Sequence, residues 1–246
     1  MATDPQAATK SLATRVEQSR ALLVQAVENH APVALASAMG AEDMVLIDQV
    51  ASDGLPVEIF VLDTGRLHRE TLSLITETRE RYSIAIKIHH PKAEAVAAYV
   101  RDHGRDGFYD SIAARKTCCG IRKVEPLGRA LAGFGAWITG LRRGQSITRT
   151  GVTESEWDEA NGLWKFNPLA HWSSDEIWRY VKDKRVPYNP LYDQGFASIG
   201  CAPCSRAIAP GENERAGRWW WETPESRECG LHVADDRLVR TTASRS

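Results

Sequence analysis

Four short apolar runs, separated by segments with helical composition, constrain the fold of this chain more than any other feature. The apolar runs cover residues 32–37, 57–62, 84–89 and 136–140. Good helix formers lie before and between them, at 11–29, 42–51, 67–80, 93–103 and 121–132. Alternation of β-prone runs with helices is typical of an α/β domain whose sheet is mostly parallel. We therefore expect an α/β fold with a mostly parallel sheet flanked by helices.

The pattern changes in the last third of the chain. Ser173 to Glu176 have the composition of a capping box, which predicts a helix that begins there and is ended by Pro187. The sequence that follows contains several Gly and Pro residues, which favours loops over strands. The final residues include few large apolar side chains. We predict a single α/β domain over 1–210 and a flexible C-terminal segment over 211–246.

Composition argues against several classes of function. The chain has 246 residues, 43% of them hydrophobic and 26% charged, and a formal net charge of −1. Such a chain lacks the basic excess of a general nucleic-acid-binding protein. Its apolar runs are shorter than the roughly 18 residues of a membrane-spanning helix, and its N-terminus shows no signal-peptide pattern. We therefore expect a cytoplasmic protein without a nucleic-acid or membrane partner.

Five cysteines form an uneven pattern. Cys118 and Cys119 are adjacent, Cys201 and Cys204 form a C-x-x-C pair, and Cys229 stands alone. The two pairs can supply one metal site only if the fold brings them together. Disulfides are disfavoured in a reducing cytosol, and five unrelated buried thiols would rarely be paired in this way. Zinc sites mostly use C-x-x-C pairs, so the adjacent pair favours an iron-sulfur cluster and leaves zinc open. The fifth cysteine is then a candidate nucleophile.

Three strand ends carry residues suited to binding an anion. These residues are Ser37, Gly40, Asp63, Thr64, Gly65, Arg142 and Arg143. A small-residue loop between a strand and a helix can present backbone N–H groups to an anion. More often, however, such a loop only connects the strand to the helix. The carboxyl ends of parallel strands meet at one edge of the sheet, where ligands of open α/β sheets bind. We expect the three ends to converge on one crevice.

Further cations accompany the cysteines. Arg122 and Lys123 follow the adjacent pair, and Arg215 and Arg218 precede Cys229. Most lysines and arginines are solvated surface charges, but these are grouped beside glycines and cysteines in a chain of nearly zero net charge. The grouping indicates a small polyanionic ligand.

Taken together, the segments resemble one known family, the assimilatory adenylyl-sulfate (APS) and phosphoadenylyl-sulfate (PAPS) reductases. The matching segments are 37–43, 62–68 (LDTGRLH), 118–127 (CCGIRKVEPL), 139–146 (TGLRRGQS), 166–169 (FNPL), 199–204 (IGCAPC), 217–221 (GRWWW) and 228–232 (ECGLH). They follow one another in order along the chain. Their joint occurrence is far more specific than any one of them.

The resemblance implies an adenine nucleotide α-hydrolase-like fold, related to the PP-loop pyrophosphatases, whose loop after the first strand holds phosphate or sulfate. It also implies that Cys229 is the catalytic residue, on a flexible C-terminal segment, and that Lys123 lies near both the substrate and a 4Fe-4S cluster. The implied cluster ligands are Cys118, Cys119, Cys201 and Cys204. The implied anion contacts are Arg122, Arg142, Arg143, Arg215 and Arg218.

The activity that the resemblance implies is thioredoxin-dependent reduction of APS to sulfite and AMP in sulfate assimilation. Cys229 would attack the substrate sulfur and form an S-sulfocysteine, from which thioredoxin would release sulfite. Reduction of PAPS, or of both nucleotides, is the alternative within the family. A PP-loop ATP pyrophosphatase or tRNA-thiolating enzyme is a second alternative, but it would need an SGGxDS-type loop, which is missing here. A nucleotide-binding iron-sulfur or zinc regulator is a third alternative, in which Cys229 would be dispensable. The sequence leaves a homo-oligomer open.

Overall fold

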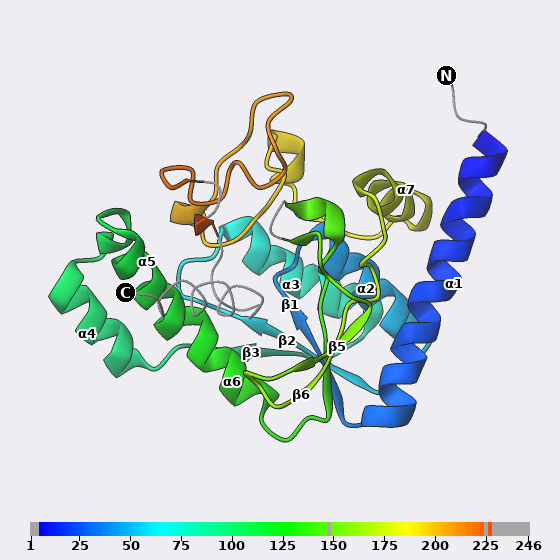
Figure 1. Cartoon of the computed structure of the whole chain (residues 1–246), viewed down its shortest axis with the longest axis horizontal. Coiled ribbons are helices and arrows are strands. Elements are labelled where there is room, and N and C mark those ends of the chain that lie inside the picture. Colours follow the sequence, from blue (N-terminus) through cyan, green and yellow to red (C-terminus); the bar gives the residue numbers. More distant parts are fainter. Residues whose placement is uncertain (1–4, 147–148, 224–225, 228–246) are drawn as a thin grey trace, which may run out of the picture.

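The computed structural model describes residues 5–146, 149–223 and 226–227. Within these residues six strands form one sheet in the order β3-β2-β1-β4-β6-β5, and only the β5–β6 pair is antiparallel (Figure 1). The strands are β1 (Val33–Ser37), β2 (Val57–Leu62), β3 (Ile86–His89), β4 (Ala136–Ile138), β5 (Ser155–Asp158) and β6 (Leu163–Phe166). The expected α/β fold with a mostly parallel sheet is confirmed.

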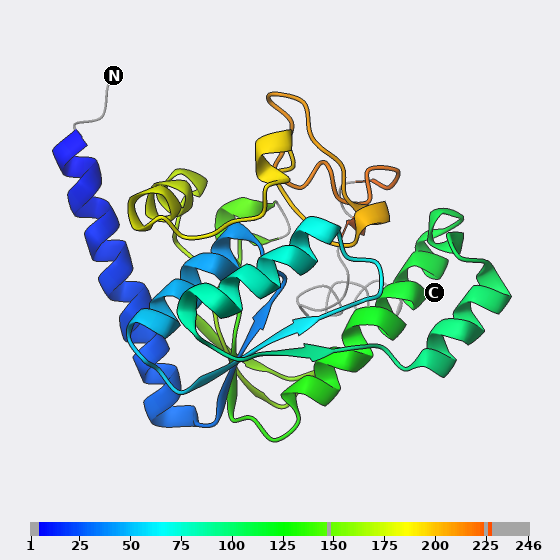
Figure 2. The same cartoon turned by 180° about the vertical axis from the view of Figure 1, so that it is seen from behind.

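Helices cover both faces of this sheet (Figures 1 and 2). They are α1 (Pro5–His30), α2 (Ala41–Ser52), α3 (Arg69–Tyr82), α4 (Ala93–His103), α5 (Ile112–Cys119), α6 (Glu125–Leu131) and α7 (Ser174–Lys184). A π-helical turn, Gly120–Val124, joins α5 to α6 without a break. The sequence did not predict α5 or the π turn. Among the described residues, no helix combines the length and the apolar character of a membrane span.

The start of α7 agrees with the capping-box prediction. The Ser173 hydroxyl accepts a hydrogen bond from the Glu176 N–H at 3.1 Å, and the Glu176 carboxylate accepts one from the Ser173 N–H at 2.7 Å. The helix ends at Lys184, before Pro187, because Arg185 adopts a left-handed conformation with a φ of 52°. That conformation directs the chain back toward the body of the protein.

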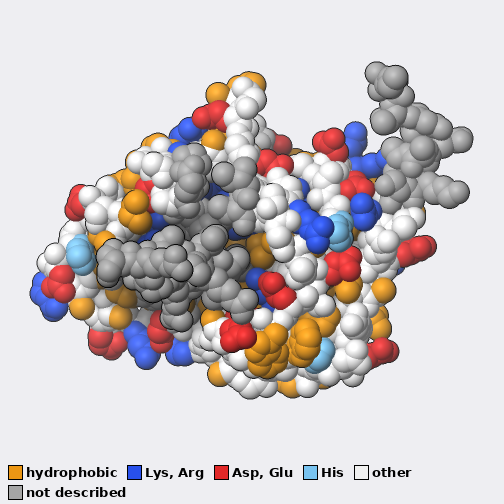
Figure 3. All heavy atoms as spheres, in the orientation of Figure 1, with side chains coloured by type: hydrophobic (Ala, Val, Ile, Leu, Met, Phe, Trp, Pro, Cys, Tyr) orange, Lys and Arg blue, Asp and Glu red, His pale blue; other side chains and the backbone are white. Residues whose placement is uncertain are grey.

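The β5–β6 hairpin is an addition to the predicted fold. Its turn is held by the Asp158 carboxylate, which accepts hydrogen bonds from the N–H groups of Ala160 and Asn161 at 3.1 and 3.3 Å. Trp157 and Trp164 pack edge to face on its outer surface and are 50% and 37% exposed. Hydrophobic side chains gather over the hairpin in Figure 3.

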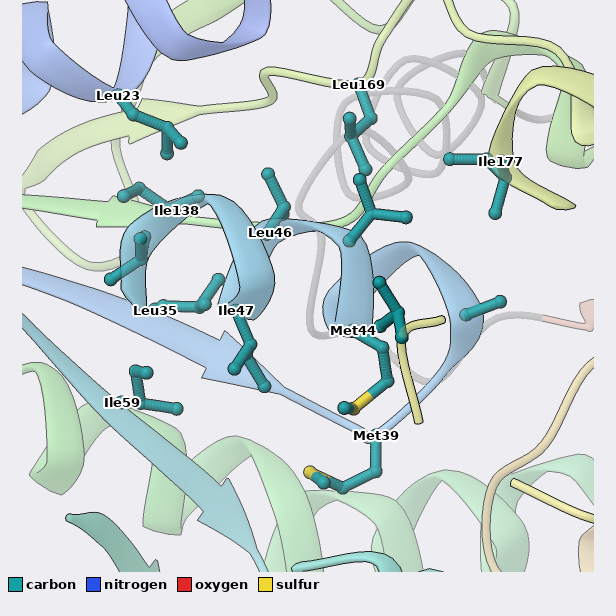
Figure 4. Close-up of a cluster of buried hydrophobic side chains, with 14 of the residues drawn as sticks. Leu23, Leu35, Met39, Met44, Leu46, Ile47, Ile59, Ile138, Leu169 and Ile177 are labelled. Atoms are coloured by element: carbon teal, nitrogen blue, oxygen red, sulfur yellow. The ribbon is translucent and has the colours of Figure 1, made fainter. Parts of the chain in front are cut away.

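Alternate strand residues face opposite sides of the sheet and build two cores. Leu35, Ile59 and Ile138 face the layer formed by α1, α2, α3 and α7 (Figure 4). On the other side, Phe60 and Trp137 pack on α6. Because both faces are covered, the parallel strands are almost entirely apolar, which is why the sequence revealed them.

The segment after α7 crosses the carboxyl end of the sheet, in yellow and orange in Figure 1. Leu67, just after β2, forms a β-bridge with Cys201, and the Ala202 N–H donates to the Arg66 carbonyl at 2.7 Å. The packing continues past residue 211, the expected start of the flexible segment. Arg218, Trp219 and Glu222 are all buried, so residues up to Arg227 include side chains that belong to the body of the protein.

Candidate active site

A cavity of about 210 Å³ opens where β1, β2 and β4 end, and we call it the strand-end cavity. The predicted substrate-binding residues that line it are Ser37, Gly40, Thr64, Lys123, Arg215 and Arg218. Phe60, Leu127 and Trp137 contribute an apolar wall. An apolar wall beside several cations suits a ligand with a flat apolar group at one end and an anion at the other.

The loop after β1 forms one side of this cavity. The Ala38 and Gly40 N–H groups donate to the Asp43 carboxylate at 2.7 and 3.2 Å. The Ser37 hydroxyl accepts from the Met39 N–H at 3.0 Å. Sequence reasoning directed these donors toward an anionic ligand, whereas in the structure an acidic side chain of the protein takes two of them.

Asp43 has an unusual electrostatic environment. The pKa of its carboxyl group is raised to about 7, mainly by burial and to a smaller extent by the neighbouring Glu42, while the N–H groups of Ala38 and Gly40 act in the opposite direction. The carboxyl group lies close to Gly140, since a Cβ at Gly140 would stand 2.5 Å from Asp43 Oδ1. Gly140 is therefore required by the close approach of the loop after β4 to the start of α2.

Arg142 and Arg143 do not line the strand-end cavity. The Arg142 guanidinium is buried between Glu42 and Glu214, with N–O distances of 2.8 and 2.9 Å. Arg143 donates to the Val152 carbonyl at 2.6 Å. Arg142 therefore links α2, which carries Glu42, to the loop that carries Glu214 and Arg215. Its positive charge is already balanced by these two carboxylates.

The residues after β2 have mainly supporting contacts. The Asp63 carboxylate accepts a hydrogen bond from the Gly65 N–H at 2.9 Å, and Gly65 has a φ of 70°. Arg122 donates to the Thr64 carbonyl at 2.6 Å, and the Thr64 hydroxyl lies 3.2 Å from Cys201 Sγ. Of these residues, only Thr64 lines the strand-end cavity.

A second, smaller cavity of about 20 Å³ lies beside the first, and we call it the cysteine cavity. All four paired cysteines line it: Cys118, Cys119, Cys201 and Cys204. The adjacent pair comes from the end of α5, and the C-x-x-C pair flanks a short 3₁₀ turn, Ala202–Cys204. The predicted convergence of the two pairs is thus present in the fold. All four are free thiols.

Positive charge surrounds these thiols. The basic side chains that line the cysteine cavity are Arg66, Arg115, Arg122, Lys123 and Arg218, and no carboxylate lines it among the described residues. Burial raises the pKa of the Cys204 thiol to about 11 and raises that of Cys118 as well. The indole N–H of Trp219 is buried without a hydrogen-bond partner in the described part of the chain. The described residues contain no group of three or more His, Cys, Asp or Glu side chains arranged to hold a metal ion.

The two cavities share Lys123, Arg218 and Trp219 as lining residues. Arg218 stacks on the Trp219 ring at 4.6 Å and donates to the Cys204 carbonyl at 3.2 Å. A Cβ at Gly200 would overlap the Arg218 guanidinium, so a larger residue there would displace Arg218 from its present position. The predicted nucleophile, Cys229, lies outside the described residues.

Sequence reasoning missed several residues of the strand-end cavity. Arg149 and Gln145 line it and are joined by a hydrogen bond of 2.6 Å. The Tyr192 hydroxyl accepts from the Ala41 N–H at the start of α2, at 3.0 Å. The other residues were predicted from their position at a strand end or beside a cysteine. Neither Arg149 nor Tyr192 has such a position, so the sequence pattern did not identify them.

Comparisons with known proteins agree with this arrangement. The model of the phosphoadenosine phosphosulfate reductase domain matches residues 32–207. A relative from Burkholderia cepacia, named adenosine 5′-phosphosulfate reductase, is 54% identical over 227 residues, which cover 92% of this chain and 91% of the relative. A protein of the same name from Allochromatium vinosum is 53% identical over 228 residues, covering 93% and 89%.

Solved structures extend the comparison. The phosphate complex of phosphoadenylyl-sulfate (PAPS) reductase from Candida auris has a TM-score of 0.67 and 25% identity, and the match covers 85% of this chain and 99% of that one. Candida glabrata FMN adenylyltransferase, with a TM-score of 0.59 and 16% identity over 100% and 86% of the two chains, shares the fold. The likeness to this nucleotide enzyme concerns the fold alone. This chain belongs to the phosphoadenosine phosphosulfate reductase family.

Proposed function

We propose that this protein reduces adenosine 5′-phosphosulfate (APS) to sulfite and AMP in sulfate assimilation. The observation that carries the proposal is the shape and charge of the strand-end cavity, in which Lys123, Arg215 and Arg218 lie beside an apolar wall. APS has a flat adenine at one end and a phosphosulfate anhydride at the other. The names of the relatives that are 53–54% identical to this chain support the same activity.

The difficulty of the reaction is electrostatic. The sulfur of APS is electrophilic and AMP is a good leaving group, but an anionic thiolate must approach an anionic sulfate. Fixed cations reduce this repulsion, and they act strongly where water is excluded. Lys123 and Arg218 are suited to this role because they line both cavities.

We assign Cys229 as the nucleophile. Its thiol loses a proton to solvent, and the thiolate attacks the sulfur of APS. A bond between Cys229 Sγ and the substrate sulfur forms, while the bond from that sulfur to the bridging oxygen breaks and AMP leaves with the electron pair. A thioredoxin thiolate then attacks Cys229 Sγ and expels sulfite, and the second thioredoxin cysteine resolves the mixed disulfide. Thioredoxin therefore supplies both electrons, and a reducing cytoplasm suits this exchange.

We propose that Cys118, Cys119, Cys201 and Cys204 hold a 4Fe-4S cluster. Four thiols bordered by five cations and no described carboxylate suit a thiolate-ligated group of net negative charge. Four thiolates are also a common ligand set for a single zinc ion, so zinc is the alternative that the iron and sulfide analysis below tests. When bound, the cluster would tie α5 to the C-x-x-C turn and contribute to the field around Lys123.

We infer that APS is preferred over PAPS, because the relatives that are 53–54% identical to this chain are named adenosine 5′-phosphosulfate reductase. The 3′-phosphate of PAPS adds negative charge, and Glu42, Asp43 and Glu214 all line the strand-end cavity. Of these, Glu42 and Glu214 are paired with Arg142. This pairing offsets the charge of both carboxylates, so the inferred preference for APS depends on the names of the relatives and is tested by the parallel incubation with PAPS.

Intact-protein mass spectrometry tests the proposal. The holoenzyme is incubated anaerobically with APS in the absence of thioredoxin, and in parallel with PAPS. We expect the mass to increase by one SO₃ group with APS, and no increase in Cys229→Ser. Absence of an adduct in the wild-type protein would reject the covalent scheme, and faster labelling by PAPS would reject the substrate assignment. Iron and sulfide analysis of the same sample tests the cluster, since zinc without sulfide would overturn it.

A further inference from the structure

Arg115, on α5, forms a buried ion pair that the reaction scheme above does not use. Its Nε and Nη2 atoms donate to the two carboxylate oxygens of Glu222 at 2.9 and 2.7 Å. The side chains of Arg115 and Glu222 are 0% and 3% exposed. A two-bond fork of this kind fixes the direction of the carboxylate as well as its distance.

The same guanidinium holds the backbone that leads to Cys229. Arg115 Nη2 donates to the Ser226 carbonyl at 2.6 Å, and the Ser226 hydroxyl donates to Glu222 at 3.0 Å. Arg227 is held in turn, because its carbonyl accepts from Arg215 at 2.8 Å and its Nε donates to the Glu222 carbonyl at 3.0 Å. We call Arg115, Glu222 and Ser226 the anchor.

The anchor lies next to both cavities. Arg115 precedes Cys118 by one turn of α5 and lines the cysteine cavity. Its guanidinium stacks on the Trp219 ring at 4.9 Å, and Trp219 lines both cavities. Arg115 is therefore in contact both with the wall of the substrate cavity and with Ser226, three residues before the nucleophile in the sequence.

Stability alone is a weak reason for such a pair. Burial of two charges costs several kcal/mol, and apolar side chains of similar volume often stabilise a protein equally well. The pair adds orientation, because the planar guanidinium can donate to the carboxylate and to the Ser226 carbonyl in only one arrangement.

We infer that Arg115 is a positioning residue for the proposed reaction. Through Glu222 and the Ser226 carbonyl it fixes the backbone at Ser226, three residues before Cys229, and it ties this backbone to the helix that carries Cys118 and Cys119. This inference depends on the proposed function.

The test compares single-turnover formation of the Cys229 adduct in the wild-type holoenzyme and in Arg115→Met. We expect the rate constant at saturating APS to fall about 100-fold, as for other misplacements of reacting groups by about 1 Å. The dissociation constant of APS should remain within about twofold, because Arg115 does not line the strand-end cavity. The iron content per chain is measured in parallel, because Arg115 lines the cysteine cavity. Hydrogen exchange of the amides of residues 222–227 should become faster.

Two further variants separate positioning from folding. Arg206→Met is the control, since Arg206 also forms a two-bond ion pair, through Nη1 and Nη2 to the Glu212 carboxylate at 3.0 and 2.9 Å, and makes no described contact with residues 226–227. This pair is partly exposed, so the control tests the loss of an Arg–Glu pair outside the anchor. We expect it to react at the wild-type rate. The exchange variant Arg115→Glu/Glu222→Arg restores a pair of opposite charges and should recover part of the lost rate.

The outcomes are distinguishable. If the wild-type protein forms no adduct, the proposed function fails. If the wild-type protein forms the adduct and Arg115→Met forms it equally fast, the positioning role is wrong. If Arg115→Met loses iron or unfolds, Glu222→Gln replaces it. If Glu222→Gln keeps its iron and reacts at the wild-type rate, the inference is overturned. If Glu222→Gln also loses iron and structure, the anchor has only a structural role and the inference is overturned as well.

Discussion

Asp43 provides a quantitative test of the strand-end cavity. Its buried carboxyl group has a pKa of about 7, compared with an ordinary value of 3.8. The folded protein therefore binds a proton at Asp43 in a pH range where the unfolded chain has already released it. Asp43→Asn removes this titration while keeping an oxygen that can accept from the Ala38 and Gly40 N–H groups.

The sign and size of the effect follow from proton linkage. A raised carboxyl pKa stabilises the fold at low pH, and this contribution is lost as the pH increases from 3.8 toward 7. The limiting slope is about 1.4 kcal/mol per pH unit for one proton. The free energy of unfolding of the wild-type protein, relative to that of Asp43→Asn, should thus fall by about 2 kcal/mol between about pH 5 and pH 7. Above about pH 8 the difference should level off, because the carboxyl group is then ionised in both states.

Urea unfolding of the two proteins at several pH values measures this difference directly. The comparison cancels the titrations that both proteins share, provided that the remaining groups respond equally. A difference in unfolding free energy that stays constant from about pH 5 to pH 8 would refute the raised pKa. A difference that increases with pH would show that the N–H groups of Ala38 and Gly40 outweigh burial, and that the folded protein prefers the carboxylate.

Three other variants test separate features. Gly140→Ala places a Cβ 2.5 Å from Asp43 Oδ1, so it should lower the free energy of unfolding by about 1–3 kcal/mol. It should also weaken APS binding, measured by calorimetry. Unchanged values of both would contradict the close approach of Gly140 to Asp43. Ser173→Ala removes the hydroxyl that caps α7 and should cost about 1 kcal/mol in urea unfolding, and a neutral result would mean that solvent satisfies the helix end. Cys204→Ser should lower the iron and sulfide content per chain relative to Ser205→Ala, and full occupancy in the cysteine variant would exclude Cys204 as a ligand.

The sequence predicted the parts of the fold in which burial is simple. The parallel strands β1, β2 and β4 are covered on both faces, so they stand out as apolar runs. The β5–β6 hairpin was missed because it lies at the sheet edge, where Trp157 and Trp164 remain partly exposed beside polar residues. Helix α5 was missed for a different reason: its buried side includes Arg115, whose charge hides the periodicity of the buried face.

The candidate site shows the same division. The two cysteine pairs could be assigned to one place because pairing is visible in a sequence, and the fold does bring them together. The role of Arg142 could not be predicted, since its partners, Glu42 and Glu214, are distant in the chain and meet it only in three dimensions. A cation beside a strand end is equally suited to an external anion and to a carboxylate of its own protein.

The π-helical turn between α5 and α6 determines how the two cavities face one another. Each residue of an α-helix turns the chain by about 100°, and a π turn contains one residue more than an α turn. Removing one residue from Gly120–Val124 would rotate α5 relative to α6 by about this angle. Cys118 and Cys119 precede the turn, Arg122 and Lys123 lie within it, and Leu127 follows it on the apolar wall. The extra residue of the turn therefore rotates the side chains before it relative to the side chains after it. As a result, the thiols face the cysteine cavity, Leu127 faces the strand-end cavity, and Lys123 lines both.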